Sequence, residues 1–358
     1  MKKEKKKNKE VSTSFTCSVQ ILVTNHCNYG CPFCVQGCPN KDLEKDFNDP
    51  LKVVSDEEIT YQRLSRVFER LVSLGVDTVT LTGGEPLIYP MLVTRLLRKA
   101  KEQGLATSLA TLGKGGFFPL VTSLVGVPKK IRDKTKTVSY LETLLYPYHS
   151  LDKLKLSVHG LLGSGVHDQL IASQYSPYGV EQEVQLILEE HASYYQNDFI
   201  LEITTVVVRQ NYDQILEIGR RLAKYSVSHW TLSVVQKRGL GITYEERIEQ
   251  AEVERLYEKL TKDWVIKNSG MKVIFRKPEP ACILVYPSGK TYVAHHSSLS
   301  GLRYLGNILQ EGDVETGWEK YADKTELLTN YMKLNPDILA RKDNMVFGAR
   351  MKNFLGIK

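Results

Sequence analysis

The sequence lacks a long hydrophobic run. No window approaches the ~20 continuous apolar residues that a membrane-spanning helix needs. The first ten residues, MKKEKKKNKE, are mostly charged, and no apolar stretch follows them, which excludes a signal peptide. We expect a solvated, disordered tail there; a tether to nucleic acid or to a membrane surface is the alternative. These absences predict a cytoplasmic protein without a membrane partner.

Cysteine is scarce as well, with six residues in a chain of 358. Four of them, Cys27, Cys31, Cys34 and Cys38, fall within one short segment. This distribution is a poor disulfide framework for a chain of this length. It is typical of a metal-binding loop in a reducing compartment.

The overall composition is that of a globular protein. Apolar residues make up 42% and charged residues 25%, so the chain can bury a core and general disorder is excluded. Its length allows one large α/β domain or two ordinary ones. The net charge of +7 comes largely from the tail, and the sequence contains no recognisable RNA-binding module. Nucleic acid is therefore an unfavoured partner, although it is not excluded.

Short β-branched runs alternate with amphipathic segments along most of the chain. The pattern predicts parallel strands joined by right-handed helical crossovers, because each strand is followed by a helix-length stretch. Six such units fit an α/β fold of the partial (β/α)6 barrel type. The expected strands are 18–24, 78–81, 105–111, 153–159, 199–208 and 229–235, and the expected helices are 56–73, 91–103, 180–194 and 212–224.

The cysteines follow the first strand with the spacing C-x-x-x-C-x-x-C, formed by Cys27, Cys31 and Cys34. Thiolate sulfur is the ligand type that selects iron–sulfur clusters and zinc. Three thiolates leave one iron of a four-iron cluster free for another ligand, much as catalytic metal sites keep an open position. Cys38 could instead supply a fourth thiolate, which would close the site as an electron-transfer cluster or a structural zinc site.

This stretch, with Phe33 directly before the third cysteine, resembles the cluster motif of the radical S-adenosylmethionine (SAM) enzymes. The resemblance implies a 4Fe-4S cluster whose open iron binds SAM, and cleavage of SAM to a 5′-deoxyadenosyl radical that abstracts hydrogen from a substrate. It also implies the six-unit partial barrel and a reductant such as flavodoxin or ferredoxin.

The same resemblance assigns residues to SAM. The turn Gly83-Gly84-Glu85-Pro86 follows the second predicted strand, and in the family this turn holds the methionine amino group. Glycines allow close backbone approach, and a carboxylate beside them can meet a cation. Ser157, at the fourth strand, corresponds to a serine that contacts the SAM carboxylate or ribose. Phe33 is expected to pack by the adenine and Thr205 to face SAM.

The substrate is less defined. Thr111, at the end of the third strand, and Lys237 with Arg238, after the sixth, are candidate substrate contacts, the last two for an anionic group. A long insertion, 113–149, is expected to shape the pocket. Only a charged tail precedes Cys17, with no room for a peptide-recognition domain. A small polar or phosphorylated metabolite is therefore the expected substrate; a peptide- or RNA-modifying enzyme and a non-catalytic iron–sulfur or zinc protein are the alternatives.

The pattern changes after about residue 245. We expect a disordered tail at 1–16, a barrel domain at 17–245, and an α+β extension at 246–358. The expected extension contains a helix at 244–263, which leads to the segment 271–276, and a hairpin at 282–294, before Gly306-Asn307-Ile308. It resembles the C-terminal extensions of radical SAM maturases, which carry auxiliary clusters. Cys282 is its one cysteine, so no auxiliary cluster is expected.

Overall fold

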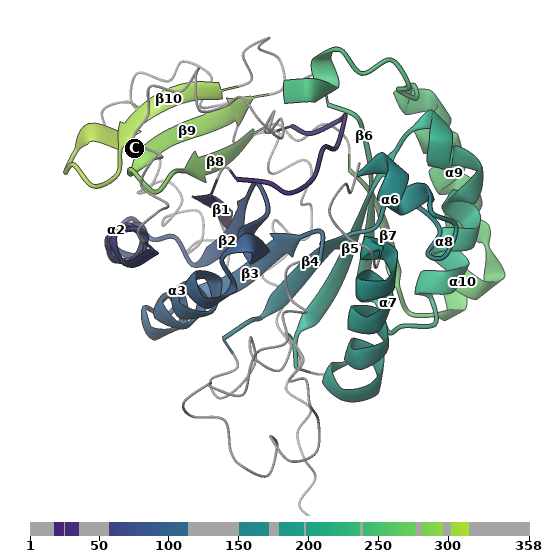
Figure 1. Cartoon of the computed structure of the whole chain (residues 1–358), viewed down its shortest axis with the longest axis horizontal. Helices are drawn as coiled ribbons and strands as arrows, with labels where there is room; N and C mark the ends of the chain where they lie inside the picture. The colour runs from purple at the N-terminus through teal and green to yellow at the C-terminus, as the bar shows by residue number, and fades with distance from the viewer. Residues whose placement is uncertain are drawn as a thin grey trace, which may run out of the picture.

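The computed structural model describes residues 18–24, 26–35, 57–113, 150–171, 179–196, 198–236, 239–276, 281–295 and 302–314. Its described strands form one sheet in the order β10-β9-β8-β1-β2-β3-β4-β5-β6-β7, with the helices on its outer side (Figure 1). The sheet is curved and not closed. The predicted α/β partial barrel is confirmed.

Strands β1 to β7 are all parallel and follow one another in chain order. Their bounds lie within a few residues of the six strands expected from the sequence, and β7 adds a seventh. They are β1 Ser18–Thr24, β2 Thr78–Gly83, β3 Ala106–Thr111, β4 Lys153–Ser157, β5 Ile200–Val207, β6 His229–Val234 and β7 Lys272–Arg276.

The helices cover one face of the sheet and bury its apolar side chains. In α2, the residues Leu64, Val67, Phe68 and Leu71 are at most 1% exposed, which places the expected apolar stripe in the core. The helices are α2 Glu57–Ser73, α3 Pro90–Glu102, α6 Val166–Leu170, α7 Val180–Glu190, α8 Ile215–Leu222, α9 Gln250–Lys262 and α10 Trp264–Asn268. None of the described helices is long and apolar enough to cross a membrane.

The other face of β1 to β7, here called the inner face, is polar. Along β4, Leu154 and Leu156 belong to the core packed against the helices, so the alternating Lys153, Lys155 and Ser157 lie on the inner face. The face is also lined by threonines, serines and one buried carboxylate, that of Glu202. A polar lining is unusual for a core and typical of a surface that meets a ligand.

The C-terminal strands extend the sheet at the β1 edge. Strand β8 (Ala281–Val285) pairs parallel with β1, and β9 (Lys290–His295) and β10 (Leu302–Asn307) follow antiparallel. The predicted hairpin is confirmed. The preceding helix begins at Gln250 and not near residue 244, because Arg247 bridges to Val208 and Glu249 caps the helix.

Candidate functional site

The cysteine loop, residues 26–35, crosses the sheet at the carboxyl ends of its strands. It leaves β1 and docks on the far side, where the Gly30 amide donates to the Ile171 carbonyl over 3.0 Å. At its end, the Leu240 amide donates to the Cys34 carbonyl over 2.9 Å. In Figure 1 the purple trace runs from β1 toward α6 and β6. The loop therefore lies over the end of the barrel where (β/α) enzymes place their sites.

The three thiols of this loop are partly to largely buried and close enough to influence one another. Burial, together with the charges of Glu85 and Cys34, raises the pKa of the Cys27 thiol to about 12. Burial, Cys34 and Cys27 also raise the pKa of Cys31 above its usual range. Three thiolates gathered in this way need a positively charged group to offset their desolvation and repulsion, which a bound metal cluster provides.

The spacing of the thiols bears on the kind of metal. Among the described residues, no three Cys, His, Asp or Glu side chains are arranged to hold a single metal ion. A zinc ion draws its sulfur ligands to about 2.3 Å from one centre. A four-iron cluster binds each thiolate to a different iron, so its ligands lie farther apart. Cys38, the alternative fourth thiolate, lies outside the described residues.

Phe33 anchors the loop in a small apolar cluster of its own. Its side chain is 5% exposed and packs with Leu170, Val208 and Val235. Two rings meet it edge-on, that of His159 at 5.1 Å and that of Tyr244 at 5.8 Å between centroids. These contacts fix the direction of the chain between Cys31 and Cys34. Packing of Phe33 by an adenine stays a prediction.

The turn after β2 lies directly under the start of the loop. The Gly84 amide donates to the Thr24 carbonyl over 2.7 Å, and the Glu85 amide donates to the His26 carbonyl over 2.9 Å. Gly83 has φ +152°, and a Cβ there would lie 2.2 Å from the Thr24 oxygen. The close approach that these glycines permit is thus to β1 itself, and these two amides are not available to a ligand.

The Glu85 carboxylate joins this turn to the end of β3. It accepts from the Thr111 hydroxyl over 2.6 Å and from the amides of Leu87 and Leu112, each over 2.9 Å. Burial raises the pKa of Glu85 to about 7, against the effect of these donors. All three donors are neutral groups of the protein, and contact of Glu85 with the amino group of SAM stays a prediction. The Thr111 hydroxyl also accepts from the Gly113 amide, which favours a bracing role over substrate contact.

The remaining predicted cofactor residues differ in position. Ser157 ends β4 on the inner face and is partly exposed, as a ligand contact requires. Thr205 is fully buried on the helix-covered face, where its hydroxyl donates to the Val158 carbonyl over 2.6 Å and accepts from the Trp230 indole over 2.9 Å. The structure thus places Thr205 in the core and not at a ligand surface. Lys237, Arg238 and residues 114–149 lie outside the described residues.

A buried histidine pair behind Phe33 was not predicted from the sequence. The His159 amide donates to His167 Nδ1 over 2.9 Å, and the Val206 amide donates to His159 Nδ1 over 3.2 Å. Asn211 holds the same segment, its Nδ2 donating to the His159 carbonyl over 2.7 Å. Burial lowers the pKa of His159 to about 4 and that of His167 to about 3. Both rings are therefore neutral, with the proton on Nε2.

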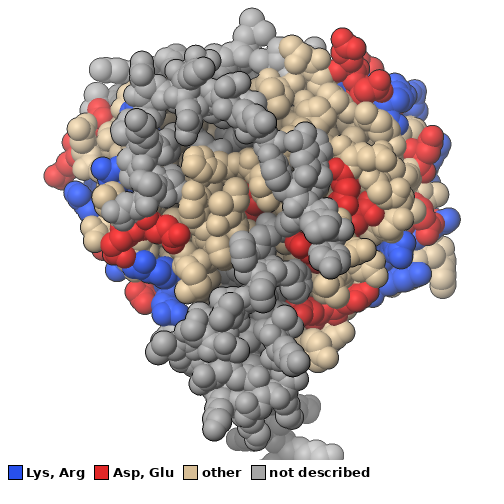
Figure 2. Space-filling view, viewed as in Figure 1, with Lys and Arg blue, Asp and Glu red and all other residues tan. Residues whose placement is uncertain are grey.

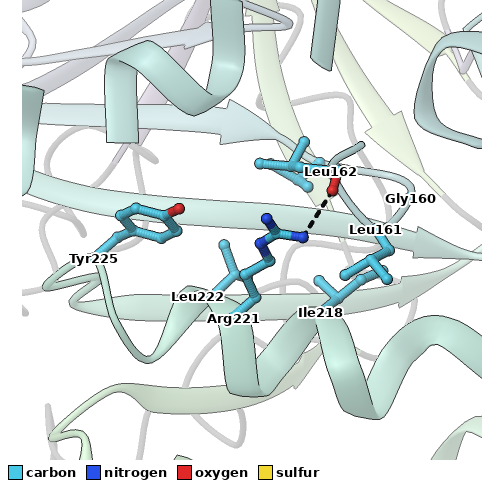
Figure 3. A pocket seen from close by; sticks show the side chains of 8 residues that line it. Gly160, Leu161, Leu162, Ile218, Arg221, Leu222 and Tyr225 are labelled. Carbon is cyan, nitrogen blue, oxygen red and sulfur yellow. Dashed lines mark hydrogen bonds between the residues drawn. The ribbon is translucent and has the colours of Figure 1, made fainter. Parts of the chain in front are cut away.

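One described pocket lies between the segment after β4, which includes Val158 and Gly160, and helix α8 (Figure 3). Its lining includes Leu161, Leu162, Ile218 and Leu222 and is mostly apolar. The Arg221 guanidinium beside it donates to the Leu162 carbonyl over 2.9 Å. None of the sequence-predicted site residues lines it, so we do not assign it to the chemistry of the cysteine loop.

The fold and loop together define a class: a three-cysteine loop on the carboxyl edge of a parallel (β/α) partial barrel. Residues 21–155 match the family model of the radical SAM superfamily. Members of this superfamily use a 4Fe-4S cluster and SAM.

Curated relatives match over a limited stretch. GTP 3′,8-cyclase of Geobacter sulfurreducens is 29% identical over 93 residues, 26% of each chain. GTP 3′,8-cyclase of Clostridium perfringens is 36% identical over 70 residues, 20% of this chain and 19% of the relative. The match spans about a quarter or less of these relatives' own length.

Solved structures share the fold. Streptococcus suis SuiB bound to S-adenosylmethionine superposes with a TM-score of 0.54 at 16% identity, covering 78% of this chain and 60% of that chain. SuiB bound to the precursor peptide SuiA gives a TM-score of 0.55 at 16% identity, covering 78% and 59%. At this identity the likeness concerns the fold alone.

Proposed function

We propose that the chain is a radical SAM enzyme that acts on a small polar or phosphorylated metabolite. Cys27, Cys31 and Cys34 would hold the 4Fe-4S cluster and leave one iron for SAM. When bound, this pair supplies a 5′-deoxyadenosyl radical that can abstract hydrogen. The observation that carries the proposal is the convergence of three partly buried thiols in a loop docked over the carboxyl edge of the sheet.

The chain's own residues would position and shield this chemistry. Hydrogen bonds from Gly84 and Glu85 fix where the loop leaves β1, and Phe33 fixes where it turns back. Ser157 offers a partly exposed hydroxyl on the inner face beneath the loop, and remains the proposed contact to the methionine end of SAM. A dry, rigid surround is what protects a radical from water and stray hydrogen donors.

The substrate class has two supports. The matched curated relatives are named for a reaction of GTP, a phosphorylated small molecule. The inner face is polar, which favours a hydrophilic substrate over a lipid. RNA is less favoured, because in Figure 2 Lys and Arg alternate with Asp and Glu on the described surface and form no extended basic patch on that face. A flavodoxin or ferredoxin reductant in the cytoplasm completes the proposal.

Anaerobic reconstitution tests it. Wild-type protein should show an electron paramagnetic resonance signal of the reduced cluster that shifts when SAM is added, and should form 5′-deoxyadenosine. Cys34→Ala should lose both, whereas Cys38→Ala should keep them. Loss in Cys38→Ala and retention in Cys34→Ala would support the closed iron–sulfur or zinc alternative instead.

A further inference from the structure

The segment 208–211, which follows β5, lies beside the ring of Phe33. Val208 is fully buried and packs with Phe33 in the small apolar cluster. The backbone of Val208 is held on two sides: its amide donates to Asn211 Oδ1 over 2.9 Å, and the residue pairs with Arg247 in an antiparallel bridge. The place of this Phe33 contact is therefore set by the segment itself and by its pairing with the chain before α9.

Asn211 connects this segment to the histidine that meets Phe33. Its side chain is fully buried, and Nδ2 donates to the His159 carbonyl over 2.7 Å and to the Val206 carbonyl over 2.8 Å. Together with the bond that Oδ1 accepts, these bonds join backbone groups of β5, of the segment 208–211 and of the residues after β4. The His159 ring, 5.1 Å from that of Phe33 between centroids, is therefore fixed relative to Val208.

Gln210 connects the same segment to the second ring beside Phe33. Gln210 is exposed, and its Oε1 accepts from the Tyr244 hydroxyl over 2.7 Å. The Tyr244 ring meets that of Phe33 edge-on at 5.8 Å between centroids. Burial raises the pKa of this hydroxyl, against the effect of the bond to Gln210, so it is a neutral donor near pH 7. The segment 208–211 therefore supplies one contact of Phe33 directly and holds two others through side-chain amides.

The position of Phe33 bears on the proposed chemistry because this residue lies between two of the predicted cluster ligands. A shift of its ring would move the backbone from Cys31 to Cys34, and edge-to-face ring pairs have a preferred geometry that resists such a shift. The adenine of SAM is predicted to pack by the same ring. A ring that is already ordered on several sides loses little conformational freedom when a ligand packs against it, so this order favours binding.

We infer that Gln210 and Asn211 are positioning residues for SAM, because they hold the two rings that meet Phe33. The inference rests on the proposed function and deepens it, since it names residues that act on the affinity for SAM through Phe33. Neither residue was predicted from the sequence. Gln210 acts on a tyrosine 34 residues later, and Asn211 on a histidine 52 residues earlier, so only the fold brings these groups together.

Titration with SAM tests the inference. The cluster would be reconstituted anaerobically in the full chain, and the shift of the electron paramagnetic resonance signal of the reduced cluster would be followed as SAM is added. Gln210→Ala and Tyr244→Phe remove the same hydrogen bond, and each should raise the Kd of SAM about threefold or more. The double variant should bind as weakly as either single variant, because only one contact is lost. The iron content should stay at the wild-type level, which separates affinity for SAM from cluster loading.

Asn211→Asp keeps the oxygen that accepts from Val208 but removes both donated bonds, so it should raise the Kd about tenfold or more. If this variant does not fold, the two milder variants decide. Gln185→Ala is the matched control: it removes an exposed glutamine that bonds within α7, and should bind SAM as wild type does. Wild-type affinity in Gln210→Ala and Tyr244→Phe, or an equal loss in Gln185→Ala, would overturn the inference alone. A wild type whose signal ignores SAM would overturn the proposed function, and this inference with it.

Discussion

Single residues set how closely the first two strands approach. Gly83 is required by both its backbone angle and its surroundings, since φ is +152° and a Cβ would lie 2.2 Å from a backbone oxygen of β1. The sequence indicated that a glycine pair precedes Glu85 but not which neighbour needed the space. That neighbour is Thr24, which lies 59 residues earlier in the chain and could be located only from the fold.

Replacing Gly83 by alanine should cost several kcal/mol of the free energy of unfolding, because the clash with Thr24 adds to the strain of the backbone angle. Gly104→Ala is the matched control: its φ is +81°, but nothing lies within 4 Å of its Cβ. It should cost only the roughly 1–2 kcal/mol of a left-handed residue. Urea denaturation of both variants measures the difference, and equal losses would show that the contact with Thr24 is unimportant.

Removing the Thr111 hydroxyl should destabilise the protein through Glu85. Thr111→Val keeps the shape of the side chain but takes one of three donors from a buried carboxylate, which should cost about 2–3 kcal/mol and raise the pKa of Glu85 further. Thr111→Ser keeps the hydroxyl and should lose less. The measurement is unfolding by urea at pH 7, and a Thr111→Val variant as stable as the wild type would refute the bracing role.

At the scale of elements, the cysteine loop is a bridge rather than a free loop. It is tied to α6 by Gly30, to the turn after β6 by Cys34, and to the ends of β4, β5 and β6 through Phe33. The spacing of the cysteines in the sequence predicts that Cys27, Cys31 and Cys34 are the three ligands. It could not predict this docking, because the partners are scattered over 70 residues from Leu170 to Leu240.

Truncating the Phe33 side chain should loosen the end of the cysteine loop near Cys34. Phe33→Ala leaves a cavity among Leu170, Val208 and Val235 and should cost about 3 kcal/mol or more. Hydrogen exchange would measure where the loss falls: the Leu240 amide, which donates to Cys34, should exchange much faster, while the Ile203 amide in β5 should not. Uniform acceleration of both amides would mean that the loop and the barrel unfold as one unit.

The elements themselves were predictable because their periodicity is strong. All six expected strands appear near their expected positions, and α2 buries the expected stripe. The start of α9 was wrong by six residues, because the pairing of Val208 with Arg247 is a long-range contact that local pattern does not encode. The prediction that Thr205 faces SAM differs from the structure for a related reason. Strand β5 has an inner face and a helix-covered face, and the local sequence does not determine on which face the Thr205 hydroxyl lies.

For the whole molecule, acid should be destabilising through the buried histidine pair. Burial holds the pKa of His159 at about 4 and that of His167 at about 3, below their ordinary value of 6.5. The unfolded chain binds these two protons first, so their contribution is complete above about pH 6.5 and is lost as pH falls toward 4 and 3. Near pH 5 the two together contribute a slope of up to about 2.7 kcal/mol per pH unit.

Urea denaturation of wild type and His167→Gln between pH 7 and pH 5 checks this. The glutamine can still accept from the His159 amide but has no proton to gain. The free energy of unfolding of this variant should therefore fall by about 1.4 kcal/mol less per pH unit than that of the wild type. Identical slopes in the two proteins would mean that carboxylates elsewhere dominate the acid response.

Deleting strands β8 to β10 should leave one edge of β1 exposed. A chain that ends at residue 276 keeps β1 to β7 but leaves the β8 side of β1 without its partner, with Leu22 no longer covered by Leu284. Exposed strand edges invite pairing between molecules. We expect this variant to aggregate, as light scattering would detect; a soluble monomer would show that β1 is stable with one neighbour.

The same pairing has a consequence for the order of events during synthesis. Ile21 pairs with Val285, 264 residues later, so β1 cannot be completed on both edges until most of the chain has left the ribosome. At about 5–20 residues per second this takes roughly 13–53 seconds. Throughout that interval the strand that precedes the cysteine loop is paired on one edge only. Iron and sulfur are therefore expected to bind after translation, once β8 has paired with β1.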